Sequence, residues 1–245
     1  MNWNNIKIKN HIKAAKALIK IKDLAFKYIS DNNKVSEFDV YNYILNEFKK
    51  RNLKTDRDNC IVSFRENTSF VHYYPSQYCK MIKSGSLIML DIWANFNKVN
   101  APFADITWMA YKGKNIPREV DKAFKLIVKA RDGAIKFIKK NLKNKNIPTG
   151  REIDSYSRKI IEQSGFGKNF KHNLGHSLGM SQPHGNYAGL TLKNNQPLKI
   201  NVGYTIEPGI YFDNKFGIRS EIDFFINKKL ELIITTPLQK NIKLI

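Results

Sequence analysis

Residues 86–94 read SLIMLDIWA, a run of apolar side chains interrupted by one acid, Asp91. The run is typical of a β-strand that is buried on both faces. An ionised carboxylate removed from water costs several kcal/mol unless a cation, a metal ion or hydrogen-bond donors meet it. Asp91 therefore predicts a partner, and that partner must come from another segment of the chain.

The composition predicts a globular protein. The chain has 245 residues, of which 42% are hydrophobic and 12% aromatic, so it can bury a large core. Residues 1–10, MNWNNIKIKN, lack the apolar centre of a signal peptide, and no uncharged apolar run is long enough to span a bilayer. We therefore expect a cytoplasmic protein with no membrane partner. The two cysteines, Cys60 and Cys79, form neither a disulfide framework nor a zinc-binding pattern.

The formal net charge is +21 at pH 7, from 42 basic and 21 acidic residues. A strongly basic surface often binds nucleic acid. Here the basic residues are mostly lysines spread over the whole length, without clusters of arginine and aromatic residues. The excess of lysine therefore reflects the overall composition of the chain, and we predict no nucleic-acid partner. The basic segment 11–30 is expected to be a surface helix that packs one face on the core, with His11 at the surface.

Two segments of the chain resemble each other. Residues 17–29, ALIKIKDLAFKYI, align with residues 126–138, LIVKARDGAIKFI, with their apolar positions in register. Both have helical periodicity, and each is followed by a second helix that opens on a capping box. The two boxes are Ser36 with Asp39 and Thr149 with Glu152. The sequence thus predicts a single domain, residues 1–245, built from two pseudo-repeats at about 10–113 and 117–236.

Strand-like runs follow the helices in each half, which predicts an α+β fold. The runs are residues 60–64, 87–96 and 103–111 in the first half, and residues 203–212, 218–226 and 230–236 in the second. Four acids lie inside these runs or at their ends: Asp91, Asp105, Glu207 and Glu221. The two acids of each half are 14 residues apart, and equivalent acids of the two halves are 116 apart. If the halves pack about a pseudo-twofold axis, the four carboxylates converge.

Converging carboxylates need cations. Without them the four groups would repel one another, and protonating them all would require large pKa shifts. Two divalent metal ions would cancel the charge, with one equivalent pair of acids bridging both ions and each acid of the other pair binding one ion. Any single acid could instead pair with one of the many lysines. The matched spacing of all four favours the metal site.

A histidine-rich segment, residues 172–185, reads HNLGHSLGMSQPHG and contains His172, His176 and His184. Its glycines allow the backbone to approach a ligand closely. One neutral imidazole would complete the shell of a metal ion, and others could move protons or bind a developing oxyanion. His72, in the stretch FVHYYP, is predicted at the end of a strand of the first half.

These motifs resemble those of the pita-bread metallopeptidases, which include methionine aminopeptidase, Xaa-Pro aminopeptidase and prolidase. The similarity covers nearly the whole chain and corresponds to the catalytic domain. It implies a pita-bread fold in which Asp105 and Glu221 bridge two divalent metal ions. Asp91 then binds one ion, and His176 with Glu207 the other. A carboxylate-rich shell with one imidazole suits manganese, cobalt, iron or zinc.

Within the family, His172 together with His176 and His184 resembles the Xaa-Pro branch, as does Arg219 near Glu221. The resemblance implies hydrolysis of the N-terminal residue of peptides at Xaa-Pro bonds by a metal-bridged hydroxide. Glu207 handles the proton, while three histidines and an arginine bind substrate and stabilise the tetrahedral intermediate. These four are His72, His172, His184 and Arg219.

The chain departs from the family pattern in two places near the first acid. Trp93 stands where the family usually has glycine, and the gap between Asp91 and Asp105 is a few residues longer than usual. Both changes affect the shape of the pocket and leave the ligand set intact.

Two alternatives remain open from the sequence. One is a methionine aminopeptidase. The other is a non-catalytic pita-bread module that binds peptides or proteins, although such modules usually lose ligands and all five ligand positions are filled here. The partners expected for the enzyme are peptide substrates, and a homodimer remains open.

Overall fold

A computed structural model describes residues 2–57 and 59–245 of the chain. It has the α+β architecture that the sequence predicted. The first half contains α1 (Asn5–Asp31), α2 (Glu37–Lys50), β1 (Leu53–Lys54), β2 (Cys60–Phe64), the 3-10 helix η1 (Arg65–Ser69), β3 (Ser86–Phe96) and β4 (Ala104–Lys112). The second contains α3 (Arg118–Lys143), α4 (Gly150–Glu162), the 3-10 helix η2 (Gly167–Asn169), β5 (Gly203–Ile206), β6 (Gly209–Phe212), β7 (Phe216–Arg219), β8 (Ile222–Ile226), β9 (Leu232–Ile234) and β10 (Lys243–Leu244).

The helices α2 and α4 begin at the two predicted capping boxes. In each, the hydroxyl of the cap residue, Ser36 or Thr149, accepts from a backbone N–H three residues on, and the acid there accepts from the cap's own N–H. Each cap residue also forms a β-bridge with a later segment, Ser36 with Met81 and Thr149 with Pro197. The two halves therefore attach their second helices in the same way. Among the described helices, none combines the length and apolar character needed to cross a bilayer.

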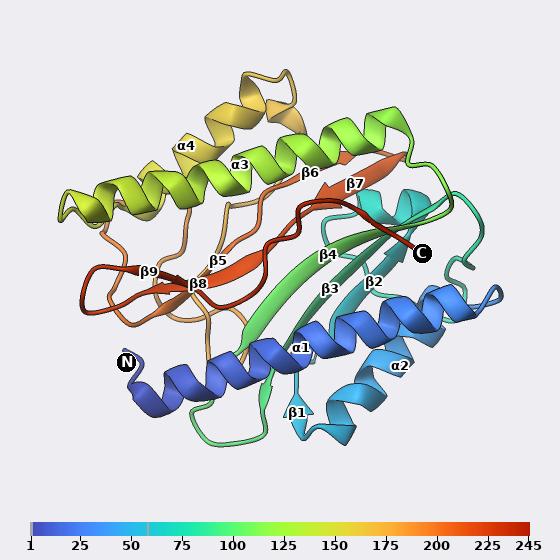
Figure 1. The fold of residues 1–245 in the computed structure, drawn as a ribbon, viewed down its shortest axis with the longest axis horizontal. Coiled ribbons are helices and arrows are strands. Elements are labelled where there is room, and N and C mark those ends of the chain that lie inside the picture. The colour runs from blue at the N-terminus through green and yellow to red at the C-terminus, as the bar shows by residue number, and fades with distance from the viewer. Residues whose placement is uncertain (1, 58) are drawn as a thin grey trace.

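The strands lie between two pairs of helices. In the described residues they form a five-stranded sheet in the order β1-β3-β4-β10 with β2 also paired to β3, a three-stranded sheet β5-β8-β9, and the pair β6-β7. Figure 1 shows α1 and α2 on one side of these strands and α3 and α4 on the other. α1 packs on β3 and β4, whereas α3 packs on α4 and β7.

The side chains of β3 alternate between two apolar cores. Ile88 and Leu90 belong to the core formed with α1 and α2, whereas Leu87 and Met89 belong to the core formed with α3 and α4. Because side chains two residues apart share a face of a strand, Asp91 follows Met89 onto the second face. Its carboxylate is therefore directed away from α1 and toward the second half of the chain.

The two predicted runs that carry glutamates, residues 203–212 and 218–226, are not continuous strands. The first breaks into β5 and β6 at Glu207, and the second into β7 and β8 at Glu221. β5 pairs antiparallel with β8, and β6 with β7, so both glutamates lie at the corner between the two pairings. Pro208 has no N–H to donate to a ladder and its carbonyl accepts from Ser220 N–H at 3.3 Å. The corner therefore interrupts both runs at their acids.

The prediction that His11 lies at the surface is wrong. The residue is fully buried, with Nδ1 2.8 Å from the carbonyl oxygen of Phe103 and Nε2 2.7 Å from Thr235 Oγ1. The ring of Trp3 lies 4.8 Å from the imidazole, centroid to centroid. Helical spacing places His11 on the buried face of α1 with Ala15 and Leu18, but it could not reveal Phe103 and Thr235, which are distant in sequence. His11 thus joins α1 to a segment of the second half.

Candidate metal centre

The two aspartates lie on one face of the β3–β4 pair. Antiparallel register places Asp91 opposite Thr107 and Asp105 opposite Trp93. Residues two apart on a strand share a face, so the two aspartates are diagonal neighbours. Both are buried, with 7% of Asp91 and 4% of Asp105 exposed. The pairing of β3 with β4 is therefore enough to bring these two carboxylates together.

The two glutamates approach the same face from the corner described above. Glu221 is joined to β4, because its Oε2 accepts from Thr107 Oγ1 at 2.8 Å and its N–H donates to the Thr107 carbonyl at 3.4 Å. Glu207 accepts from Thr205 Oγ1 at 3.0 Å through Oε1, and its N–H donates to the Leu174 carbonyl at 2.8 Å. Each glutamate is thus positioned through both its backbone and its carboxylate.

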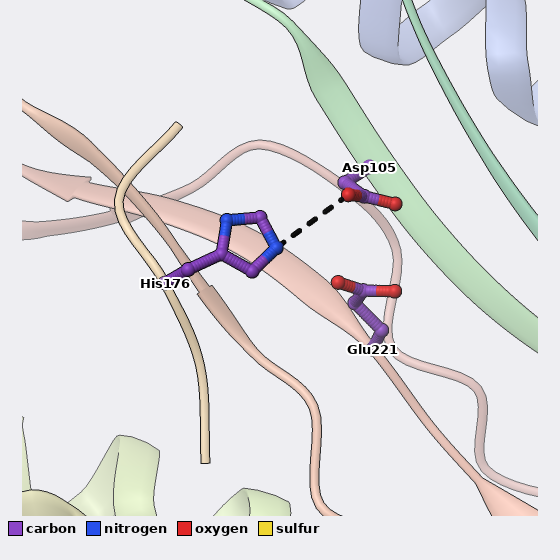
Figure 2. Close-up of side chains that lie close together, drawn as sticks. All are labelled: Asp105, His176 and Glu221. Carbon is purple, nitrogen blue, oxygen red and sulfur yellow. Dashed lines mark ion pairs between the residues drawn. The ribbon is translucent and has the colours of Figure 1, made fainter. Parts of the chain in front are cut away.

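Asp105, His176 and Glu221 form a cluster in which one candidate ligand atom from each lies within 4.8 Å of the others. Figure 2 shows the three side chains, which come from three separate segments, directed toward one another. His176 Nε2 lies 3.7 Å from Asp105 Oδ2 and 3.4 Å from Glu207 Oε1. Asp105 Oδ1 is buried and has no hydrogen-bond partner among the described residues. A divalent cation would satisfy such an oxygen, so the donor set fits a metal ion.

His176 is held by its backbone and by its own ring. Its N–H donates to Thr205 Oγ1 at 3.0 Å, and the Thr205 N–H donates to its carbonyl at 2.9 Å. The approach is close because a Cβ at Gly175 would lie 2.2 Å from the Thr205 carbonyl oxygen, which only glycine avoids. His176 Nδ1 lies 3.1 Å from the Ser177 carbonyl, which favours a proton on Nδ1 and leaves the Nε2 lone pair for a metal.

Burial sets the protonation of the cluster. Burial and the charge of Glu221 raise the pKa of Asp105 well above its usual range. Burial likewise raises the pKa of Glu221 well above its usual range. Burial also raises the pKa of Glu207 to about 8 and lowers the pKa of His176 to about 3. Without a cation these carboxyls favour their protonated forms and the imidazole stays neutral. Divalent cations would replace the protons, as expected of a metal site.

A cavity of about 330 Å³ opens over the cluster and is lined by all five predicted ligands and by His72 and His184. The His184 ring stacks on the His176 ring at 3.9 Å between centroids. His72 lies in the loop after η1, so the prediction of a strand end is wrong. The described residues that line the cavity do not include His172. Its Nε2 is 2.9 Å from the Tyr211 hydroxyl.

The sequence profile of metallopeptidase family M24 matches residues 9–228. The chain is a member of metallopeptidase family M24. The resemblance and the fold class predicted from the motifs are therefore confirmed. An uncharacterized peptidase of Staphylococcus epidermidis is 29% identical over 201 residues, which are 82% of this chain and 53% of that protein. The M24 chain thus spans about half the length of this relative.

Solved structures resemble the M24 chain over its whole length. An X-Pro aminopeptidase from Thermotoga maritima superposes with a TM-score of 0.84 at 27% identity, covering 100% of this chain and 65% of that one. An Xaa-Pro dipeptidase from Bacillus anthracis superposes with a TM-score of 0.83 at 25% identity, covering 100% and 64%.

Arg219 of the M24 chain is placed against Asp91, the first of the predicted ligands. Its guanidinium forms an ion pair with Asp91 Oδ2, and its Nε donates to Thr107 Oγ1 at 3.2 Å. Burial alone would lower the pKa of Arg219, but the charge of Asp91 outweighs burial and raises it above its ordinary value. Only 3% of the residue is exposed. Arg219 therefore holds Asp91 in place as well as bordering the cavity.

The sequence analysis missed two hydroxyl groups that position the acids of the M24 site. Thr107 is two residues after Asp105 and bonds to Glu221, and Thr205 is two residues before Glu207 and bonds to it. The two-residue spacing on a strand could have identified both threonines, because it places them on the same face as the neighbouring acid.

Proposed function

We propose that this chain is a metal-dependent aminopeptidase that removes the N-terminal residue of peptides with proline in the second position. The observation that carries the proposal is the convergence of Asp105, His176 and Glu221 at a cavity that two further acids, Asp91 and Glu207, also line. The names of the two similar solved structures, an X-Pro aminopeptidase and an Xaa-Pro dipeptidase, support the substrate class.

We assign the metal site to five residues: Asp91, Asp105, His176, Glu207 and Glu221. Their four carboxylates carry a charge that two divalent cations would balance, with Asp105 and Glu221 shared between the ions. When bound, such ions supply Lewis acidity and an activated water. Manganese, cobalt, iron and zinc all accept this donor set.

The chain's own groups would do the remaining chemistry. Glu207 would take a proton from the attacking water and release it for the leaving nitrogen, because its Oε1 lies at the cavity beside His176 Nε2. His72 and His184 line the cavity, so their ring N–H groups can donate to a carbonyl oxygen that gains negative charge. We assign His172 to orienting this region through its contact with Tyr211.

Proline in the second position imposes a specific requirement. The nitrogen of an Xaa-Pro bond carries no hydrogen, so the enzyme must recognise the ring by shape and supply a proton to the leaving nitrogen. His184 stacks on His176 and is itself exposed to the cavity, which suits it to pass the proton that Glu207 releases on to that nitrogen.

The test is a peptide panel that varies the first two positions, assayed with each of the four metals. We expect Ala-Pro-peptides to be cleaved far better than Met-Ala-peptides. A preference for Met-Ala would make the chain a methionine aminopeptidase. Peptide binding without turnover under every metal would identify a binding module and refute the proposal.

A further inference from the structure

The wall of the cavity next to Asp91 is built around Trp93, which stands where the family usually has glycine. Trp93 is on the same face of β3 as Asp91 and packs with Ile61 and Phe103 in a small apolar cluster. Ile61 lies opposite Asp91 across the β2–β3 pair and also lines the cavity. This part of the cavity therefore presents an apolar surface next to the first metal ligand.

A carboxylate lies at the end of this apolar surface. Asp56, in the connection between β1 and β2, lines the cavity and is half-buried. Its Oδ1 accepts from the indole Nε1–H of Trp93 at 2.8 Å. A carboxylate offers about four lone-pair sites, so this one bond leaves Asp56 able to accept from a ligand in the cavity.

Asp56 differs in charge balance from the other acids of the cavity. Asp91 is paired with Arg219, and the remaining ligands would be neutralised by divalent cations under the proposed function. Asp56 is not in the proposed metal-ligand set, and its carboxylate contacts the indole N–H of Trp93.

We propose that Asp56, Trp93 and Ile61 form a specificity site for a first residue with a long aliphatic stem and a cationic end, lysine or arginine. The stem would lie on Trp93 and Ile61, and the cation would reach Asp56. This inference rests on the proposed aminopeptidase function.

The position of Asp56 favours contact with a cationic side chain of the substrate over contact with the substrate's own α-ammonium group. The α-ammonium is attached next to the scissile carbonyl and must stay at the metal ligands. Two residues of strand, about 7 Å, separate Trp93 from Asp91, and Asp56 contacts the indole N–H, which lies in the part of the Trp93 side chain distal from the strand. This separation is comparable to the length of a lysine or arginine side chain.

The net charge of +21 would repel cationic peptides at long range. Salt screens such repulsion beyond about 8 Å at physiological ionic strength, whereas a contact inside the cavity is screened much less. A preference for basic first residues must therefore come from the local site.

The test compares kcat/KM for Lys-Pro and norleucine-Pro peptides, which differ in the terminal ammonium group, with the metal-loaded full chain. We expect the lysine peptide to be favoured on the order of tenfold, the size of one hydrogen bond between charged groups. Asp56→Asn keeps the shape of the side chain and should bring the ratio close to one. Trp93→Phe keeps a ring but removes the N–H that orients Asp56, and should reduce the ratio partly. Asp31→Asn, which changes an exposed acid on α1, should leave the ratio as it is.

An unchanged ratio in Asp56→Asn would overturn the inference, even if kcat/KM fell equally for both peptides. Cleavage of Ala-Pro-peptides without any preference for lysine over norleucine would overturn the inference and leave the proposed function standing. If no peptide is cleaved, calorimetric binding of lysine amide against norleucine amide still decides the question. Tighter binding of lysine amide that Asp56→Asn abolishes supports the site, and equal binding refutes it.

Discussion

The two halves of the chain position their acids by different means. In the first half, Asp91 and Asp105 lie within β3 and β4, and strand register makes them diagonal neighbours. In the second half, Glu207 and Glu221 lie at a corner where two strand pairs meet, and each depends on bonds to other segments.

This difference shows that equal spacing in sequence need not mean equal local structure. The 14-residue interval of the first half spans two long paired strands, whereas that of the second half spans one corner and the β6–β7 pair. The equivalent acids Asp105 and Glu221 nevertheless meet in one cluster with His176. If the halves are equivalent in function, variants at matched positions should behave alike.

The largest expected effect concerns the two acids assigned as bridges, one from each half. Asp105→Ala and Glu221→Ala should each lower bound metal by more than one ion, because each acid would hold both ions. Activity should fall by more than the roughly 10³-fold loss typical of one electrostatic contact. Metal analysis by mass spectrometry checks the stoichiometry. Two retained ions in either variant would break the symmetric assignment.

The second prediction concerns the buried link between the halves at His11. Burial lowers the pKa of His11 to about 4, so the folded protein keeps it neutral while the unfolded chain protonates it near its ordinary value. Stability from His11 is therefore full above about pH 6.5 and is lost as the pH falls toward 4, by about 3 kcal/mol in the free energy of unfolding.

Urea unfolding of chelator-treated protein at pH 7 and pH 4 measures this loss. His11→Gln should lack that part of the acid destabilisation, whereas His72→Gln, which changes an exposed imidazole, should retain it. The same pH dependence in His11→Gln as in the unmodified protein would show that His11 is not the group responsible.

The third prediction compares the histidines that each half contributes to the cavity. His184→Ala should keep nearly two equivalents of metal and lose about a hundredfold or more in kcat/KM, the usual size of a lost proton transfer or oxyanion contact. His72→Ala is the matched variant of the first half and should behave in the same way. If His184→Ala keeps its full metal content and near-normal turnover, His184 has no catalytic role and serves only in the turn.

The smallest effects concern the two capping boxes. Ser36→Ala and Thr149→Ala should each lower the free energy of unfolding by about 1 kcal/mol, because each hydroxyl satisfies a helix N-terminal N–H. Ser155→Ala, on the exposed side of α4, should have almost no effect. A clearly larger cost in one half would show that the matched caps support unequal parts of the fold.

Local sequence information was enough for the elements that local physics determines. The strand at 60–64 and the buried run around Asp91 follow from apolar patterning, and both capping boxes follow from a hydroxyl and an acid three residues apart. The spacing of the four acids also predicted their convergence. The roles of the ligands and of the catalytic histidines remain predictions, and so do the repeat boundaries.

What only the tertiary structure decided depends on contacts between residues far apart in the chain. His11 is buried because Phe103 and Thr235 meet its ring, 92 and 224 residues away. Two predicted strands break at their glutamates because strand pairing changes partners there. Trp93 meets Asp56 because β1, β2 and β3 lie in one sheet. Sequence by itself determined which side chains are candidates for the chemistry, because side-chain type and local period are written along the chain. Three-dimensional packing decided which of them meet.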